Sequence, residues 1–201
     1  MRERIELEEI YRASLGVFAQ YGFRKTTVED IAEKLDRTKG NLYFYVKDKR
    51  ELYIKTVSFA LERWQNRVRD AVAAETGARK QLLVLCRKAV EYLSQDGELR
   101  DILKQDPDIF PMFPTVDPYE SINKRSIRMI TGILKKGIKE KVFRPVDVDK
   151  VSQVIFSIYK MVIIRTYIKA DDGFVQEMFE DTLDLLLNGL FIESERSGGT
   201  G

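Results

Sequence analysis

The placement of proline constrains this chain more than any other feature of its sequence. None of the five prolines lies in the first 106 residues, and four of them fall within residues 107–118. Proline breaks helices because it lacks a backbone N–H, so helices are possible before and after this segment but not through it. Apolar residues recur at helical spacing along nearly the whole chain, as at Val28, Ile31 and Leu35. We therefore predict an all-α fold of about nine helices.

Polar residues mark where several of these helices begin. Thr27, Thr38 and Asp48 each precede an apolar run, in the position where a side-chain oxygen accepts the free N–H groups of a helix start. Either Asp147 or Asp149 is expected to open the penultimate helix in the same way.

The composition narrows the possible function classes. The chain is 44% hydrophobic and 33% charged, as in globular proteins. It has no apolar run of the roughly 20 residues that a membrane span needs, and its first 20 residues are charged, so we expect a cytoplasmic protein without membrane contact. Histidine is absent, which removes the commonest general base and a common metal ligand. We expect no enzyme activity, catalytic residue, metal site or cofactor, and a buried, unreactive thiol at Cys86.

Two short helices lie close together in the N-terminal quarter of the chain. The first spans residues 28–35, and only Asp36 and Arg37 separate it from Thr38, which begins a second helix expected to end near Val46. Helices joined so tightly cross steeply, as in a helix-turn-helix. Both can pack against the preceding helix through apolar residues, namely Ile31, Leu35, Leu42 and Val46 against Val17, Phe18 and Tyr21.

Positive charge is concentrated in the same segment. Five basic residues and one acidic residue lie between Arg37 and Arg50, a net charge of +4, whereas the whole chain carries +2. The first residues of a helix suit phosphate contact and reach base edges in the major groove. Here these residues are Thr38, Lys39, Gly40 and Asn41. The alternative is a solvated basic face, but the consecutive aromatic residues 43–45 cannot all enter one core.

The segments 18–35 and 40–52 resemble the DNA-binding region of the tetracycline-repressor (TetR/AcrR-type) family of transcriptional regulators, over about residues 8–53. The resemblance implies that the DNA backbone is held by Thr26 or Thr27, Tyr43 and Lys49. It also implies that the groove is faced by Thr38, Lys39, Asn41, Phe44 and Tyr45. Where the family usually has a glycine, this chain has Asp36, and that difference affects how Arg37 reaches the DNA.

The resemblance also implies a domain organisation and a function. Residues 1–48 are expected to form the helix-turn-helix DNA-binding domain, 49–194 a helical effector-binding and dimerisation domain, and 195–201 a disordered tail. The expected function is a regulator, most often a repressor, that binds a palindromic double-stranded DNA operator as a dimer and is released by a small apolar or amphipathic effector. An activator of the same fold and a helical protein-interaction adaptor remain alternatives.

A ligand cavity between packed helices is usually apolar with few polar groups. The candidate lining residues are Phe59, Trp64, Phe110, Met112, Phe113, Tyr119 and Tyr159. The proline-rich segment 107–118 is either a lid over this pocket or a plain loop. Four cations occur on helices that can face the cavity, and an inward one would indicate an anionic ligand: Arg125, Arg128, Lys160 and Arg165.

The last two predicted helices, 149–169 and 174–192, carry apolar residues on more than one face. A helix that is apolar on two faces needs two neighbours. The family resemblance implies that these helices form a four-helix interface in a homodimer. The alternative is burial of both faces within one subunit.

Overall fold

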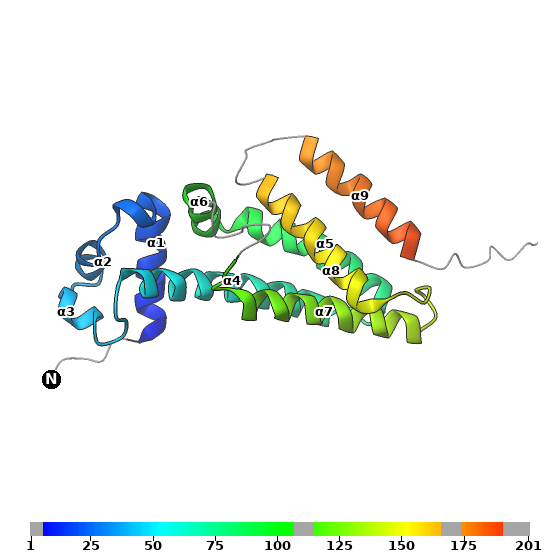
Figure 1. Ribbon diagram of the computed structural model, residues 1–201, viewed down its shortest axis with the longest axis horizontal. Helices are drawn as coiled ribbons and strands as arrows, with labels where there is room; N and C mark the ends of the chain where they lie inside the picture. Colours follow the sequence, from blue (N-terminus) through cyan, green and yellow to red (C-terminus); the bar gives the residue numbers. More distant parts are fainter. Residues whose placement is uncertain (1–5, 107–114, 166–173, 191–201) are drawn as a thin grey trace, which may run out of the picture.

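A computed structural model of the protein describes residues 6–106, 115–165 and 174–190. These residues form nine α helices and no β-sheet, which confirms the predicted fold class (Figure 1). The helices are α1 (Leu7–Lys25), α2 (Val28–Lys34), α3 (Lys39–Leu42), α4 (Lys49–Ala73), α5 (Ala78–Gln95), α6 (Gly97–Gln105), α7 (Glu120–Lys139), α8 (Val148–Ile163) and α9 (Phe174–Leu190). The tail 195–201 and the candidates Phe110, Met112 and Phe113 lie outside the described residues.

The predicted helix starts are present, but the Thr38 side chain accepts no N–H group of α3, because its hydroxyl donates to the Asn41 side chain instead. Thr27 forms a capping box, in which its hydroxyl accepts from the Asp30 N–H at 3.2 Å and the Asp30 carboxylate accepts from the Thr27 N–H at 2.7 Å. Asp48 and Asp147 each accept the backbone N–H three residues further on, at 2.7 and 3.1 Å. Asp147 is therefore the residue that opens α8, which decides between the two aspartates proposed for that position.

The helices α1, α2 and α3 form a compact unit at one end of the molecule (Figure 1). Phe18, Ile31 and Leu42 are fully buried at its centre, as expected. The expectation that Tyr21 joins them is wrong, because its side chain is 49% exposed. The Tyr53 ring of α4 packs against Phe18 instead, with a centroid distance of 4.9 Å.

Helix α4 runs without a break from this unit into a bundle with α5, α7 and α8 (Figure 1). Helix α6 packs against α1, so the two predicted domains meet over a wide surface. One continuous cluster of buried apolar side chains extends from α1 to α9. No helix in the described ranges is both long and apolar enough to cross a membrane.

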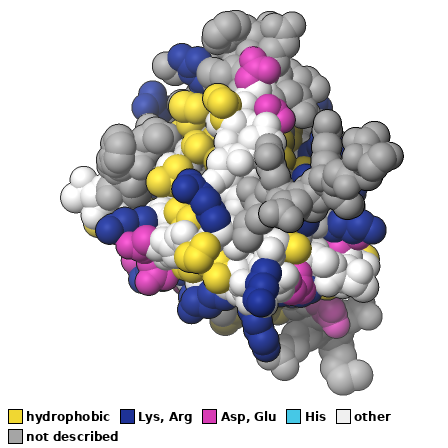
Figure 2. Space-filling model, turned by 90° about the vertical axis from the view of Figure 1, so that its right-hand side faces the viewer, with side chains coloured by type: hydrophobic (Ala, Val, Ile, Leu, Met, Phe, Trp, Pro, Cys, Tyr) yellow, Lys and Arg dark blue, Asp and Glu magenta, His cyan; other side chains and the backbone are white. Residues whose placement is uncertain are grey.

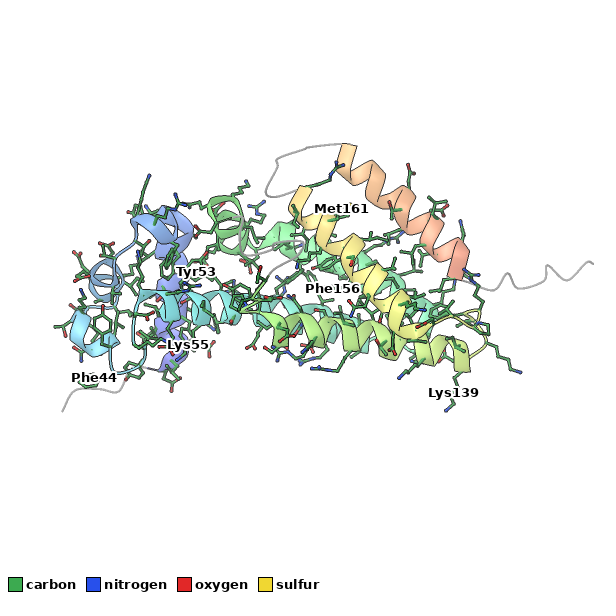
Figure 3. The ribbon with its side chains drawn as sticks, in the orientation of Figure 1. Phe44, Tyr53, Lys55, Lys139, Phe156 and Met161 are labelled. Atoms are coloured by element: carbon green, nitrogen blue, oxygen red, sulfur yellow. The ribbon has the colours of Figure 1, made fainter. Side chains whose placement is uncertain are left out.

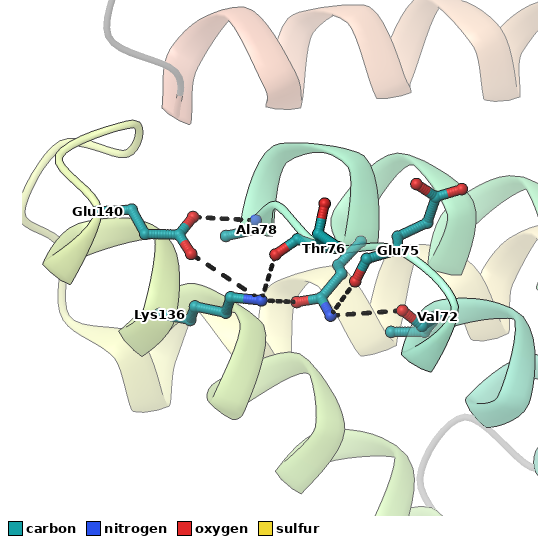
Figure 4. A network of polar contacts seen from close by, with 7 residues as sticks. Val72, Glu75, Thr76, Ala78, Lys136 and Glu140 are labelled. Atoms are coloured by element: carbon teal, nitrogen blue, oxygen red, sulfur yellow. Dashed lines mark hydrogen bonds and ion pairs between the residues drawn. The ribbon is translucent and has the colours of Figure 1, made fainter.

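The far end of α4 is fixed to α7 by a polar network at the turn between α4 and α5 (Figure 4). The Lys136 ammonium donates to the Thr76 carbonyl at 2.7 Å and to the Gln81 side chain at 3.1 Å. The Glu140 carboxylate accepts from the Ala78 N–H at 3.0 Å. Because the contacts with Thr76 and Ala78 satisfy backbone groups at the turn, the network holds α4 and α7 together at the end away from α1, α2 and α3.

Candidate nucleic-acid interface and internal cavity

The helix α3 is shorter than its sequence pattern predicts. It ends at Leu42 rather than Val46, and the next residues form a turn in which the N–H groups of Tyr45 and Val46 both bond to the Leu42 carbonyl, at 2.9 and 3.2 Å. This turn buries Leu42 and Val46 and leaves Phe44 85% exposed at the outer end of the unit (Figure 3). The prediction that at least one of three consecutive aromatic residues lies outside the core is confirmed.

The turn between α2 and α3 has the backbone geometry that a glycine usually provides. Asp36 has a φ of 53°, in the left-handed region. Its N–H bonds to the Glu33 carbonyl at 3.0 Å, and the N–H of Arg37 bonds to the Ala32 carbonyl at 2.9 Å. These are the two hydrogen bonds of a Schellman motif, which ends a helix through one left-handed residue. Asp36 therefore keeps the tight turn, and Arg37 is exposed beside it.

The residues at the start of α3 are exposed and already connected to one another. The Thr38 hydroxyl donates to the side-chain oxygen of the half-buried Asn41. The Lys39 ammonium pairs with Glu29 of α2 and lies 5.7 Å from the centre of the Tyr43 ring. The Glu29 carboxylate raises the pKa of Lys39 above its usual range. Gly40, between Lys39 and Asn41 in the sequence, is exposed, so another molecule can approach the backbone closely at this point.

The residues expected to hold the DNA backbone differ in how far their side chains are exposed. Thr26 is fully buried and its hydroxyl donates to the Gly22 carbonyl at 2.9 Å, so its side chain cannot contact DNA. Thr27 is exposed. The half-buried Lys49 donates to the carbonyls of Phe23 and Thr26, both at 2.9 Å. Lys49 therefore binds two carbonyls at the end of α1 and in the residue that follows it, a structural role that the sequence does not reveal because its partners are more than 20 residues away.

Four basic side chains are exposed around α3, namely Arg37, Lys39, Lys47 and Arg50. The aromatic side chains there are the exposed Tyr43 and Phe44 and the half-buried Tyr45. This surface thus combines exposed cations, aromatic rings and a helix start on a rigid turn. Such a surface suits contact with phosphates and with base edges.

A second site lies inside the bundle, where α4, α5, α7, α8 and α9 surround a narrow cavity of about 50 Å³. Most of its lining is apolar. The polar groups are already satisfied in part: the Gln65 amide donates to the Ser126 hydroxyl at 2.7 Å, and the Trp64 indole N–H donates to the Ala89 carbonyl at 3.0 Å. The Trp64 ring stacks on Tyr159 with a centroid distance of 5.7 Å.

Two of the predicted lining residues, Trp64 and Tyr159, do line this cavity. Phe59 does not, because five positions before Trp64 the side chain points to another side of α4, where it packs on Tyr11 with ring centres 6.0 Å apart. Tyr119 lines a separate hollow near Asp106. The lining residues that were missed follow the helical stripes of α4, α5, α7, α8 and α9: Gln65, Val68, Leu85, Cys86, Ala89, Ser126, Met129, Ile130, Ile155, Phe156, Ile158, Leu183 and Leu186.

The four cations proposed as inward-facing differ in how far their side chains are buried. Arg125 pairs with Glu62 at 2.6 Å on the surface, Arg128 is exposed and Arg165 is half-buried. Lys160 of α8 is the buried one, with 8% of its surface exposed.

Cys86 is half-buried in the wall of the cavity, and burial raises the pKa of its thiol to about 12. The described parts of the chain hold no group of acidic and cysteine side chains arranged to bind a metal.

The end of α6 joins the N-terminal unit to the bundle. The Asp106 carboxylate accepts from the Phe23 N–H at 3.1 Å and from the Tyr53 hydroxyl at 2.8 Å. The neighbouring Gln105 amide donates to the Ala19 carbonyl. A displacement of α6 would therefore act directly on α1 and on the start of α4.

The chain is similar to known bacterial regulatory proteins. Residues 10–56 match the family model for bacterial regulatory proteins of the tetR family. The HTH-type transcriptional repressor KstR2 of Mycobacterium tuberculosis is 27% identical over 183 residues, which cover 90% of this chain and 91% of that protein. A fatty acid metabolism regulator protein of Bacillus subtilis is 22% identical over 94% of this chain and 97% of its own.

Among solved structures, FadR from Bacillus subtilis in complex with stearoyl-CoA has the same fold. Its TM-score is 0.73 at 20% identity, and the match covers 92% of this chain and 99% of FadR. Both the N-terminal unit and the helical bundle are thus found together in proteins of similar length.

Proposed function

We propose that the chain is a transcriptional repressor of the TetR family of bacterial regulatory proteins rather than an enzyme. In this proposal a homodimer binds a palindromic DNA operator in the cytoplasm and leaves it when an apolar or amphipathic effector enters the cavity. The observation that carries the proposal is the exposed basic surface around the start of α3, held on a rigid turn. The function of KstR2 as a repressor, in a relative of nearly the same length, supports the sign of regulation.

Each part of this surface has its own role in the proposal. In our proposal Thr38, Lys39, Gly40 and Asn41 enter the major groove, where a lysine can pair with guanine and an asparagine with adenine. Phe44 and Tyr45 face the groove beside them. The DNA backbone is held by exposed side chains, which set the register without reading the sequence, namely Thr27, Arg37, Tyr43 and Lys47. Lys49 contributes its remaining N–H to a phosphate.

Lys47→Ala and Lys49→Ala should weaken DNA binding for different reasons. Lys47 is exposed, so its loss should lower affinity for all sequences and reduce the log–log salt dependence of binding by about 0.9. Lys49 binds the carbonyls of Phe23 and Thr26, so its loss should also lower the free energy of unfolding by about 2 kcal/mol. Titration of DNA at several salt concentrations and urea denaturation separate the two effects. An unchanged unfolding curve for Lys49→Ala would contradict the structural role.

The cavity has the position and chemistry of an effector site, but it is small. Ligand sites usually enclose about 300–1,000 Å³, whereas this cavity has about 50 Å³. An effector therefore has to move the surrounding helices. Because α4 is fixed to α7 at its far end and bonded to Asp106 near its start, movement in the bundle changes the position of the DNA-binding unit. The effector then favours the arrangement that does not bind DNA.

The complex of FadR with stearoyl-CoA supports an effector with a long apolar chain. Trp64 provides the test, because it is the single tryptophan and lines the cavity. Stearoyl-CoA should change the Trp64 fluorescence and release operator DNA over the same concentration range. The Trp64→Phe variant controls for signals from outside the cavity. If the protein does not bind DNA in a salt-dependent way, or if no apolar or amphipathic compound changes that binding, the proposal is wrong.

Dimerisation has its own structural support on the last two helices. Val154 of α8 and Leu185 of α9 are 53% and 76% exposed, although both are apolar. Figure 2, which shows the molecule from the end away from α1, α2 and α3, has apolar side chains at the surface between lysine and arginine side chains. A subunit interface over these two helices would remove such apolar side chains from water. We therefore propose that α8 and α9 pack against their copies in a partner subunit.

A further inference from the structure

Lys39 differs from the other exposed cations around α3 because a carboxylate already holds it. Its ammonium forms an ion pair with Glu29 of α2 and lies 5.7 Å from the centre of the Tyr43 ring, within the range of a cation–π contact. The Lys39 ammonium in turn holds the pKa of the Glu29 carboxyl below its usual range. Among the residues that the structure describes, no carboxylate pairs with the other exposed cations of this surface, namely Arg37, Lys47 and Arg50.

The pair of Glu29 and Lys39 is not needed to hold α2 and α3 together. The two side chains are 56% and 45% exposed, and exposed ion pairs contribute little to stability. The two helices are joined by the left-handed turn at Asp36, and each buries a side chain in the core, Ile31 and Leu42. A carboxylate on a DNA-binding surface also repels phosphates. Its place beside Lys39 therefore indicates a role in binding rather than in folding.

The ion pair treats two kinds of DNA contact differently. A lysine ammonium has three N–H donors, so with one donor on Glu29 two remain for neutral acceptors such as guanine O6 and N7. A phosphate carries a negative charge, which the Glu29 carboxylate repels and which competes with that carboxylate for the same ammonium. Lys39 can thus keep Glu29 while it binds a guanine edge, whereas binding to a phosphate separates the pair.

We propose that Glu29 is a positioning residue that determines specificity, because it directs Lys39 to a guanine edge in the major groove and keeps it from the DNA backbone. The inference rests on the proposed function and deepens it, since it gives a residue outside α3 a role in base discrimination. A shuffled sequence offers the same phosphates as the operator but not the matching guanine. It therefore gains little from the paired Lys39, whereas the operator gains hydrogen bonds to a base edge.

The experiment compares Glu29→Gln with the original chain on two DNA probes. The first is the duplex that the original chain selects from a pool with a random centre, and the second is a shuffled duplex of the same composition. Glu29→Gln frees Lys39 for a phosphate, so affinity for the shuffled duplex should rise by about 3- to 10-fold and its log–log salt dependence should become steeper by about 0.9. Affinity for the selected duplex should rise less. A new selection with the variant should show a weaker preference for guanine at one position of each half-site.

Glu33→Gln is the matched control. Glu33 lies four residues later on α2, is exposed, and has no ion pair with any described residue, so this variant removes the same charge without freeing a lysine. It should leave the salt dependence and the guanine preference as they are in the original chain. In a Lys39→Gln background, Glu29→Gln should no longer make the salt dependence steeper, because the cation that it would free is gone.

Equal effects of Glu29→Gln and Glu33→Gln would overturn the role of Glu29, since any lost carboxylate would then do the same. Equal losses of affinity on both duplexes would also overturn it, because a purely structural residue produces that result. In both cases the original chain still binds DNA, so the proposed function stands. An original chain that binds neither duplex in a salt-dependent way would overturn the proposed function and this inference with it.

Discussion

Val154→Asp combined with Leu185→Asp should give a monomer and raise the dissociation constant of the dimer by at least about 100-fold, which corresponds to about 2.7 kcal/mol. Both side chains are apolar and exposed in the single chain. In a symmetric dimer each substitution occurs twice, so four carboxylates would be buried without partners. Affinity for a palindromic operator should fall by a similar or larger factor, because the two half-sites are then no longer bound together.

The control for this prediction is Val116→Asp. Val116 is also apolar and exposed, but it lies outside the last two helices, and its replacement should leave the dimer intact. Sedimentation velocity over a range of protein concentrations measures the oligomeric state. Binding to a single half-site should be nearly unchanged in the double variant, since α1, α2 and α3 are not touched. A stable dimer in the double variant would place the interface elsewhere.

The parts of the fold that the sequence predicts well are those decided by neighbouring residues. Thr27 and Asp48 cap their helices because a side-chain oxygen needs only the N–H three positions later. Asp36 takes the left-handed position because a short polar residue tolerates that conformation better than most residues do. The order of the helices follows from such local signals together with the spacing of apolar residues.

The parts that the sequence does not predict depend on distant contacts. Lys49 bonds to carbonyls of α1, and Asp106 joins α6 to Phe23 and to Tyr53. Neither pairing has a pattern in the sequence, because partners so far apart are brought together only by packing. The cavity shows the same limit. The sequence indicates six aromatic residues and Met112 as lining candidates, but the lining depends on which side of each helix faces inward, and this excludes Phe59.

The junction between α7 and α8 also depends on a contact that the sequence does not indicate. Lys141 has a φ of 58°, and the N–H groups of Val142 and Phe143 both bond to the Gly137 carbonyl, at 3.0 and 3.1 Å. The chain thus folds back over the end of α7, and the buried Phe143 ring lies directly on Gly137. A Cβ atom at residue 137 would come within 2.0 Å of that ring. The glycine is therefore required for space, although it weakens the helix.

Gly137→Ala should lower the free energy of unfolding by about 1–3 kcal/mol, because the ring of Phe143 has to move from its packed position. Gly132→Ala is the matched control on the same helix, where nothing lies within 4 Å of the added Cβ, and it should stabilise the protein by up to about 1 kcal/mol. Urea denaturation measures both.

Phe143→Ala alone should destabilise the protein by about 3–5 kcal/mol, since the ring is fully buried. In that background, however, Gly137→Ala should no longer be harmful, because the atom it would meet is gone. The sign of its effect should then match that of Gly132→Ala, and the double-mutant cycle should show a strong coupling between residues 137 and 143. If Gly137→Ala destabilises both backgrounds equally, its cost comes from the backbone of α7 and not from the packing of Phe143.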